Sequence, residues 1–246
     1  MSQLPQRTII RSIQQPVLLI EGSDTPLYPI RSGSLNSLHL LGDSNVLDST
    51  YVAINGINTL ASDDVWNNEA EIVMAGMGRN CHAFQYFSDT VFRRMFQTAR
   101  VNRLNALCNR YIDFGLKIRL IGHSNGADLI CRLLNTYSPI IDEVHLIAGA
   151  SECDCNRNGI NRAFDDKRLR RAVFYCSKKD SALKQAKLSK TLLGWAGFGY
   201  DYVGLVGPSN VRMSDNVRVV WRDDFNHGDW FVGSNLNWTL STVCSP

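Results

Sequence analysis

The chain has 246 residues, of which 44% are hydrophobic and 20% charged, which suits one large globular domain and excludes a disordered chain. With 26 basic and 23 acidic residues the formal net charge is +3, and this balance gives no reason to expect a nucleic-acid partner. No run reaches the ~18–20 apolar residues that span a bilayer, so no integral membrane segment is predicted.

The first residues and the cysteines indicate a compartment. Residues 1–11 include Pro5 and lack the ~7–15-residue apolar region of a signal peptide. The seven cysteines are odd in number and irregularly spaced, which disfavours a disulfide framework. We therefore expect reduced thiols and a cytoplasmic location. Cys153 and Cys155 are too close for the usual zinc spacing and no second Cys/His pair accompanies them, so no metal site is predicted.

Short apolar, β-branched runs predict strands along the whole chain, and the first two of them would give residues 1–45 the role of edge strands. Continuous apolar runs are typical of strands that are covered on both faces. The predicted strands are Pro16–Glu21, Ser37–Leu41, Tyr51–Ile54, Glu71–Met74, Lys117–Ile121, Glu143–Ile147, Ala172–Cys176 and Val217–Trp221.

Apolar residues at three- and four-residue steps predict helices between the later strands. Two such stretches lie between Ala83 and Ile112, a third runs over Ala127–Leu134 and a fourth over Leu183–Leu193. Strands alternating with helices predict a single α/β domain over residues 1–246. Its sheet would be doubly wound and mostly parallel, with helices on both faces.

The sharpest local signal is Gly122-His123-Ser124-Asn125-Gly126, which directly follows the predicted strand Lys117–Ile121 and directly precedes an apolar helix. This is Gly-x-Ser-x-Gly in the strand–turn–helix context of a nucleophile elbow. The chain must reverse sharply there, and flanking glycines keep Cβ atoms out of the crowded turn. The serine would also lie at a helix N-terminus, where backbone N–H groups favour developing negative charge.

On these residues the chain resembles the α/β-hydrolase superfamily of serine esterases and lipases, over about Tyr51 to the C-terminus. The resemblance implies the α/β-hydrolase fold and a triad in the chain order serine, acid, histidine. His227 matches the histidine, because it lies beside Gly228 in a loop after a late strand, whereas His145 is interpreted as a packed residue of a strand.

The acid has two candidates. Asp180 follows the predicted strand Ala172–Cys176 and matches the usual position in the superfamily, although an aspartate there could simply cap the next helix. Asp154 is the alternative, one strand earlier. The turn that begins at Asp154 also matches the first half of an EF-hand loop, but it carries only two acids and is interpreted as a polar turn.

The resemblance also implies an oxyanion hole made by the backbone N–H groups of Asn125, next to the serine, and of Ile57, in the loop after Tyr51–Ile54. In that loop Asn55 replaces the more common histidine, which leaves the second donor open.

Together these residues predict a serine hydrolase that cleaves a carboxylic ester through an acyl-enzyme, with Ser124, Asp180 and His227 as the triad. It would act on a small-molecule ester or acyl substrate without a cofactor. A thioesterase with the same triad and a non-catalytic binding protein on the same fold remain the alternatives.

The sequence also suggests how the site is covered. Only about twenty residues, 151–170, separate two predicted strands, so no large cap domain is predicted there. Trp195 and Phe198, in the glycine-rich segment 192–208, are candidate walls of a substrate pocket, unless they pack into the core instead.

Overall fold

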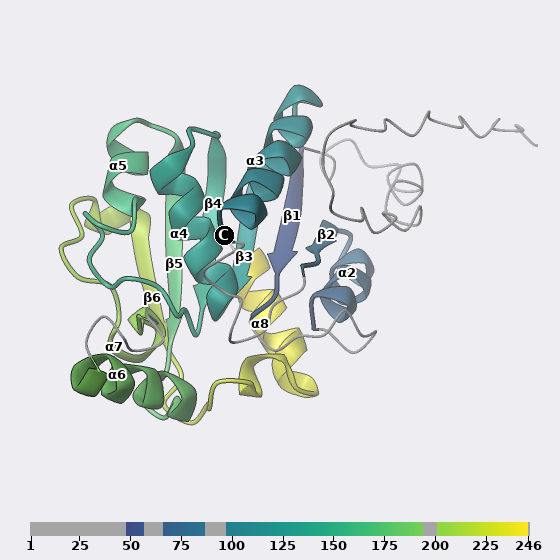
Figure 1. Ribbon diagram of the computed structural model, residues 1–246. Coiled ribbons are helices and arrows are strands. Elements are labelled where there is room, and N and C mark those ends of the chain that lie inside the picture. The colour runs from purple at the N-terminus through teal and green to yellow at the C-terminus, as the bar shows by residue number, and fades with distance from the viewer. Residues whose placement is uncertain (1–47, 57–65, 87–96, 194–200, 246) are drawn as a thin grey trace, which may run out of the picture.

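The computed structural model describes residues 48–56, 66–86, 97–193 and 201–245. Within these ranges, six strands form one sheet in the order β2-β1-β3-β4-β5-β6 (Figure 1), and every neighbouring pair is parallel. The strands are β1 (Ser49–Ile54), β2 (Asn80–Phe84), β3 (Lys117–His123), β4 (Ile141–Ile147), β5 (Leu169–Cys176) and β6 (Val217–Trp221). The predicted doubly wound α/β fold is thereby confirmed.

Helices cover both faces of this sheet. They are α2 (Trp66–Gly76), α3 (Gln97–Asp113), α4 (Asn125–Thr136), α5 (Ile160–Asp165), α6 (Ser181–Leu193), α7 (Val203–Val206) and α8 (Ser234–Cys244), with the short 3-10 turns η3 (Ser214–Asn216) and η4 (Asp229–Phe231). One apolar core joins α3, α4 and α5 to one face, and a second joins α2 and α8 to the other. The sheet is therefore buried on both sides, which explains the short apolar runs in its strands.

The strand order contains one reversal, at β1. From β1 the chain passes through α2 to β2 on one side, and then through α3 to β3 on the other side of β1. Loops that leave the carboxyl ends of β1 and β3 therefore diverge, and such switch points are where open α/β sheets place their sites. Ser124 directly follows β3, and Gly56 lies two residues after the end of β1.

The sequence prediction was wrong around residues 71–84. Glu71–Met74 belongs to helix α2 and not to a strand, and the strand is Asn80–Phe84, whose last two residues were assigned to a helix. A four-residue apolar run fits either structure. Helical spacing decides it here, because Trp66, Ala70 and Met74 are buried at four-residue steps while Ile72 is exposed.

The helices predicted over Ala127–Leu134 and Leu183–Leu193 correspond to α4 and α6. Between β4 and β5 the chain forms only the short helix α5, in keeping with the absence of a large cap there. The predicted strands Pro16–Glu21 and Ser37–Leu41, and with them the edge-strand role of residues 1–45, lie outside the described residues. No helix in the described ranges is long and apolar enough to cross a membrane.

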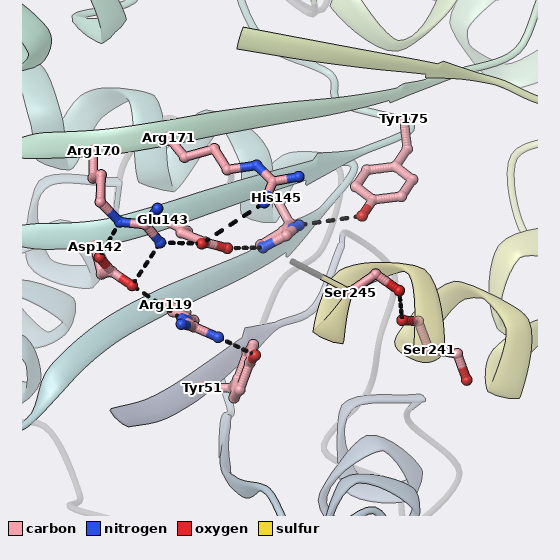
Figure 2. A network of polar contacts seen from close by, with 10 residues as sticks. All are labelled: Tyr51, Arg119, Asp142, Glu143, His145, Arg170, Arg171, Tyr175, Ser241 and Ser245. Atoms are coloured by element: carbon pink, nitrogen blue, oxygen red, sulfur yellow. Dashed lines mark hydrogen bonds and ion pairs between the residues drawn. The ribbon is translucent and has the colours of Figure 1, made fainter. Parts of the chain in front are cut away.

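A polar network occupies the sheet face beneath α8, towards the amino ends of the strands (Figure 2). Arg119 on β3 lies opposite Glu143 on β4. The buried His145 forms two hydrogen bonds of 3.2 Å, one between Nε2 and Glu143 Oε2 and one between Nδ1 and the Tyr175 hydroxyl. Burial lowers the pKa of His145, which favours its neutral form. Because Glu143 and Tyr175 hold both ring nitrogens, His145 is a structural residue, in agreement with its interpretation as a packed residue of the sheet.

Candidate active site

Ser124 lies in the tight turn between β3 and α4. Its φ of 52° and ψ of −114° are in a region that L-residues rarely adopt. Neighbouring backbone holds it there: Ser124 N–H donates to Ile147 O at 3.0 Å, and Ser124 C=O accepts from Ala127 and Ala150. A residue kept in such a strained conformation by its surroundings is typical of a functional turn. Ser124 is buried, and its hydroxyl makes no hydrogen bond to any described residue.

The two glycines of the elbow are required by close backbone contacts. A Cβ atom on Gly126 would lie 2.4 Å from Ile54 O and 2.8 Å from Asn55 O, and one on Gly122 would lie 2.7 Å from Ala127 N. These neighbours are backbone atoms of the sheet and of α4, which cannot rotate away. The glycines therefore let α4 start against the end of β1.

We expect Gly126→Ala to destabilise the fold by about 1–3 kcal/mol or more, because the added methyl group overlaps backbone atoms. The measurement is urea-induced unfolding, with Gly76→Ala in α2 as the control, since a Cβ at Gly76 meets no atom within 4 Å. Equal stability of the two variants would contradict this steric account.

Asp180 and His227 meet at the same edge of the sheet. Asp180, just after β5, is fully buried, and its Oδ2 accepts a hydrogen bond from His227 Nδ1 at 2.7 Å. Its other oxygen, Oδ1, accepts from the Leu183 N–H at 2.8 Å and caps α6. Asp180 is thus both a helix cap and the partner of His227. With the proton on Nδ1, the Nε2 of a neutral His227 is an acceptor.

His123, the residue before the serine, fixes the histidine loop. Its Nε2–H donates to the His227 carbonyl oxygen at 3.0 Å, and its ring packs edge-on against Phe231 and Trp66. Burial, reinforced by the neighbouring His227, lowers the pKa of His123 from 6.5 to about 3. His123 therefore stays neutral, and the backbone of His227 is tied to the elbow itself.

The low pKa of His123 predicts a pH dependence of stability. Below pH 6.5 the unfolded chain binds a proton at this residue and the folded chain does not, so stability falls by up to about 1.4 kcal/mol per pH unit down to about pH 3. The difference in unfolding free energy between the wild type and His123→Gln should therefore shrink as the pH falls from 7 to 4. Denaturant titrations at several pH values test this, and parallel curves would contradict it.

The ends of β1 and α4 are joined beside Ser124. The buried Tyr86 hydroxyl donates to Asn55 O at 2.7 Å and accepts from Asn125 Nδ2 at 2.9 Å. A Cβ on Gly56 would lie 3.1 Å from the Ser124 Cβ, so the loop after β1 approaches the serine closely. Asn125, the first residue of α4, belongs to the helix end whose N–H groups have no acceptor within the helix. Ile57, the other predicted oxyanion donor, lies outside the described residues.

The remaining candidates are Asp154, Trp195 and Phe198. Asp154 Oδ1 accepts from the Asn156 N–H and its Oδ2 faces Arg157 at 3.9 Å, so the structure brings Asp180, and not Asp154, to His227. Trp195 and Phe198 lie outside the described residues. In the described part of the chain, no three His, Cys, Asp or Glu side chains gather as metal ligands would.

The chain resembles known proteins in structure and not in sequence. No family model matches the sequence. No curated protein matches it either. An esterase from Pyrococcus furiosus is 13% identical with a TM-score of 0.50, and the match covers 80% of each chain. A protein from Agrobacterium vitis assigned as a hydrolase has the same identity and TM-score, over 80% of this chain and 87% of its own.

At such low identity the likeness is one of fold. It agrees with the parallel sheet and the helices that surround it. The chain has the α/β-hydrolase fold.

Proposed function

We propose that the protein is a serine hydrolase that cleaves a carboxylic ester, with Ser124 as nucleophile, His227 as general base and Asp180 as its partner. The observation that carries the proposal is the 2.7 Å contact between Asp180 Oδ2 and His227 Nδ1. His123, the residue before the strained Ser124, binds the carbonyl oxygen of the same histidine. The contact with Asp180 orients the imidazole and leaves Nε2 to accept a proton, as acyl transfer requires.

The reaction begins when Ser124 Oγ attacks the ester carbonyl carbon and passes its proton to His227 Nε2. The buried Asp180 carboxylate stabilises the imidazolium that forms. Catalytic hydrogen bonds are often long or poorly aligned without substrate, so we expect the Ser124 hydroxyl to bond to Nε2 only once the ester is bound.

The tetrahedral intermediate carries a negative oxygen, which the N–H groups of Asn125 and Ile57 would bind. His227 then gives its proton to the departing alcohol, and an acyl group remains on Ser124 Oγ. A water molecule, deprotonated by His227, attacks the acyl-enzyme and releases the carboxylic acid. No cofactor takes part in these steps.

The substrate would be a small ester whose acyl chain lies against Trp195 and Phe198. Hydrolysis of p-nitrophenyl esters from acetate to palmitate tests this part. We expect short and medium chains to be cleaved without a lipid interface, and cleavage of long chains only at an interface would contradict the pocket.

The test of the proposal as a whole is covalent labelling with a fluorophosphonate. Ser124 Oγ should displace fluoride and form a bond to phosphorus, and mass spectrometry of the digested protein should place the label on Ser124 alone. Labelling should abolish hydrolysis of p-nitrophenyl butyrate. A folded protein that is neither labelled nor active would instead favour the binding protein on the same fold.

A further inference from the structure

Asn226 joins the two loops that carry Asp180 and His227. Its Oδ1 accepts three hydrogen bonds, each of 2.9 Å, from the Ser181 N–H, the Ser181 hydroxyl and the His227 N–H. Ser181 directly follows Asp180, so this single oxygen receives donors from the neighbours of both members of the pair. The Asn226 side chain is exposed, and it is therefore not part of the apolar core.

The backbone of Asn226 is also fixed. Its N–H donates to Asp229 Oδ2 at 2.7 Å, which closes the turn that contains His227. On the inner side of the same turn, the Ser177 hydroxyl donates to Phe225 O. The loop after β6 is thus attached to the loop after β5 on both sides of the contact between Asp180 and His227.

We propose that Asn226 is a positioning residue that sets the distance and orientation between Asp180 and His227, an inference that rests on the proposed function. Asp180 is held by helix α6, and the His123 side chain holds the His227 carbonyl oxygen. The Asn226 side chain binds the other backbone group of His227, its N–H, and links it to Ser181, the first residue of α6. Both the N–H and the C=O of His227 are therefore held by hydrogen bonds, which fixes the backbone that carries the imidazole.

The three donors need an acceptor and make no use of the Asn226 amide nitrogen. An aspartate has the same shape and accepts in the same place, and its charge at the N-terminus of α6 is favourable. An alanine removes the connection to Ser181 and keeps the hydrogen bonds that Ser177 and Lys178 make to the loop after β6. Asn226→Ala therefore removes the acceptor, whereas Asn226→Asp changes the residue and keeps the acceptor.

The first test is kinetic. Asn226→Ala should lower kcat for p-nitrophenyl butyrate by roughly 10- to 100-fold with little change in KM, because a small misplacement of the base slows the chemical step and Asn226 does not touch substrate. Asn226→Asp should stay within about threefold of the wild type. Asn216→Ala is the control, since this asparagine donates one hydrogen bond, to Arg170 O, at the opposite end of β6. Full activity of Asn226→Ala, or equal losses in the Ala and Asp variants, would overturn the proposal.

The second test does not depend on activity. The Nδ1–H proton shared by His227 and Asp180 gives a downfield proton NMR signal, which His227→Ala identifies. Asn226→Ala should broaden or remove this signal through faster exchange with water, while Asn226→Asp and Asn216→Ala keep it. If the signal responds in this way in a protein without esterase activity, the proposed function fails and the positioning role stands. An unchanged signal in Asn226→Ala overturns the positioning role.

Discussion

Replacing Ser124 with alanine is expected to abolish fluorophosphonate labelling and to reduce ester hydrolysis by roughly 10³-fold or more, as in other serine hydrolases whose nucleophile is removed. The hydroxyl has no hydrogen-bond partner among the described residues, so its removal breaks no contact that supports the fold. The melting temperature should therefore stay close to that of the wild type, and the loss of activity can be assigned to chemistry.

Ser241→Ala in α8 is a matched control, because this serine lies in the helix on the far face of the sheet and contributes its carbonyl oxygen to Ser245. It should keep both labelling and turnover. Near-normal turnover in a folded Ser124→Ala protein would remove Ser124 from the mechanism.

Asp180→Asn is expected to lower kcat by about 10³- to 10⁴-fold. The amide nitrogen would face the Nδ1–H of His227, so two donors would meet and the imidazole would change to the tautomer that cannot accept the serine proton. The fold should survive, because the remaining Oδ1 can still accept from Leu183 and cap α6. Steady-state kinetics together with thermal melting measure the two effects separately.

Asp154→Asn is the comparison for this variant. Asp154 contacts an exposed arginine at 3.9 Å and no histidine, so its replacement should change stability little and leave turnover nearly unchanged. If Asp154→Asn were the more damaging of the two, the acid would have to be reassigned to Asp154.

The sequence alone determined the features that depend on local contacts. The elbow could be predicted because the glycines, the strand before it and the helix after it are contiguous, and the steric need for glycine acts within this short stretch. The central strands β3, β4 and β5 could be predicted because burial on both faces favours apolar and β-branched residues, which recur in each of them. Chain order and the family resemblance were enough to nominate His227.

Only the tertiary structure decided the features that depend on neighbours distant in sequence. Glu71–Met74 is helical because α2 packs its buried stripe on the sheet, a fact that four residues cannot encode. Asp180 caps α6 with one carboxylate oxygen and binds His227 with the other. From the sequence these two roles were alternatives, because the position of His227 relative to Asp180 was not known. Tyr86 and Asn226 carry no sequence motif. Their roles arise because hydrogen bonds join residues 31 to 45 positions apart, and such pairings exist only once the sheet has brought the loops to one edge.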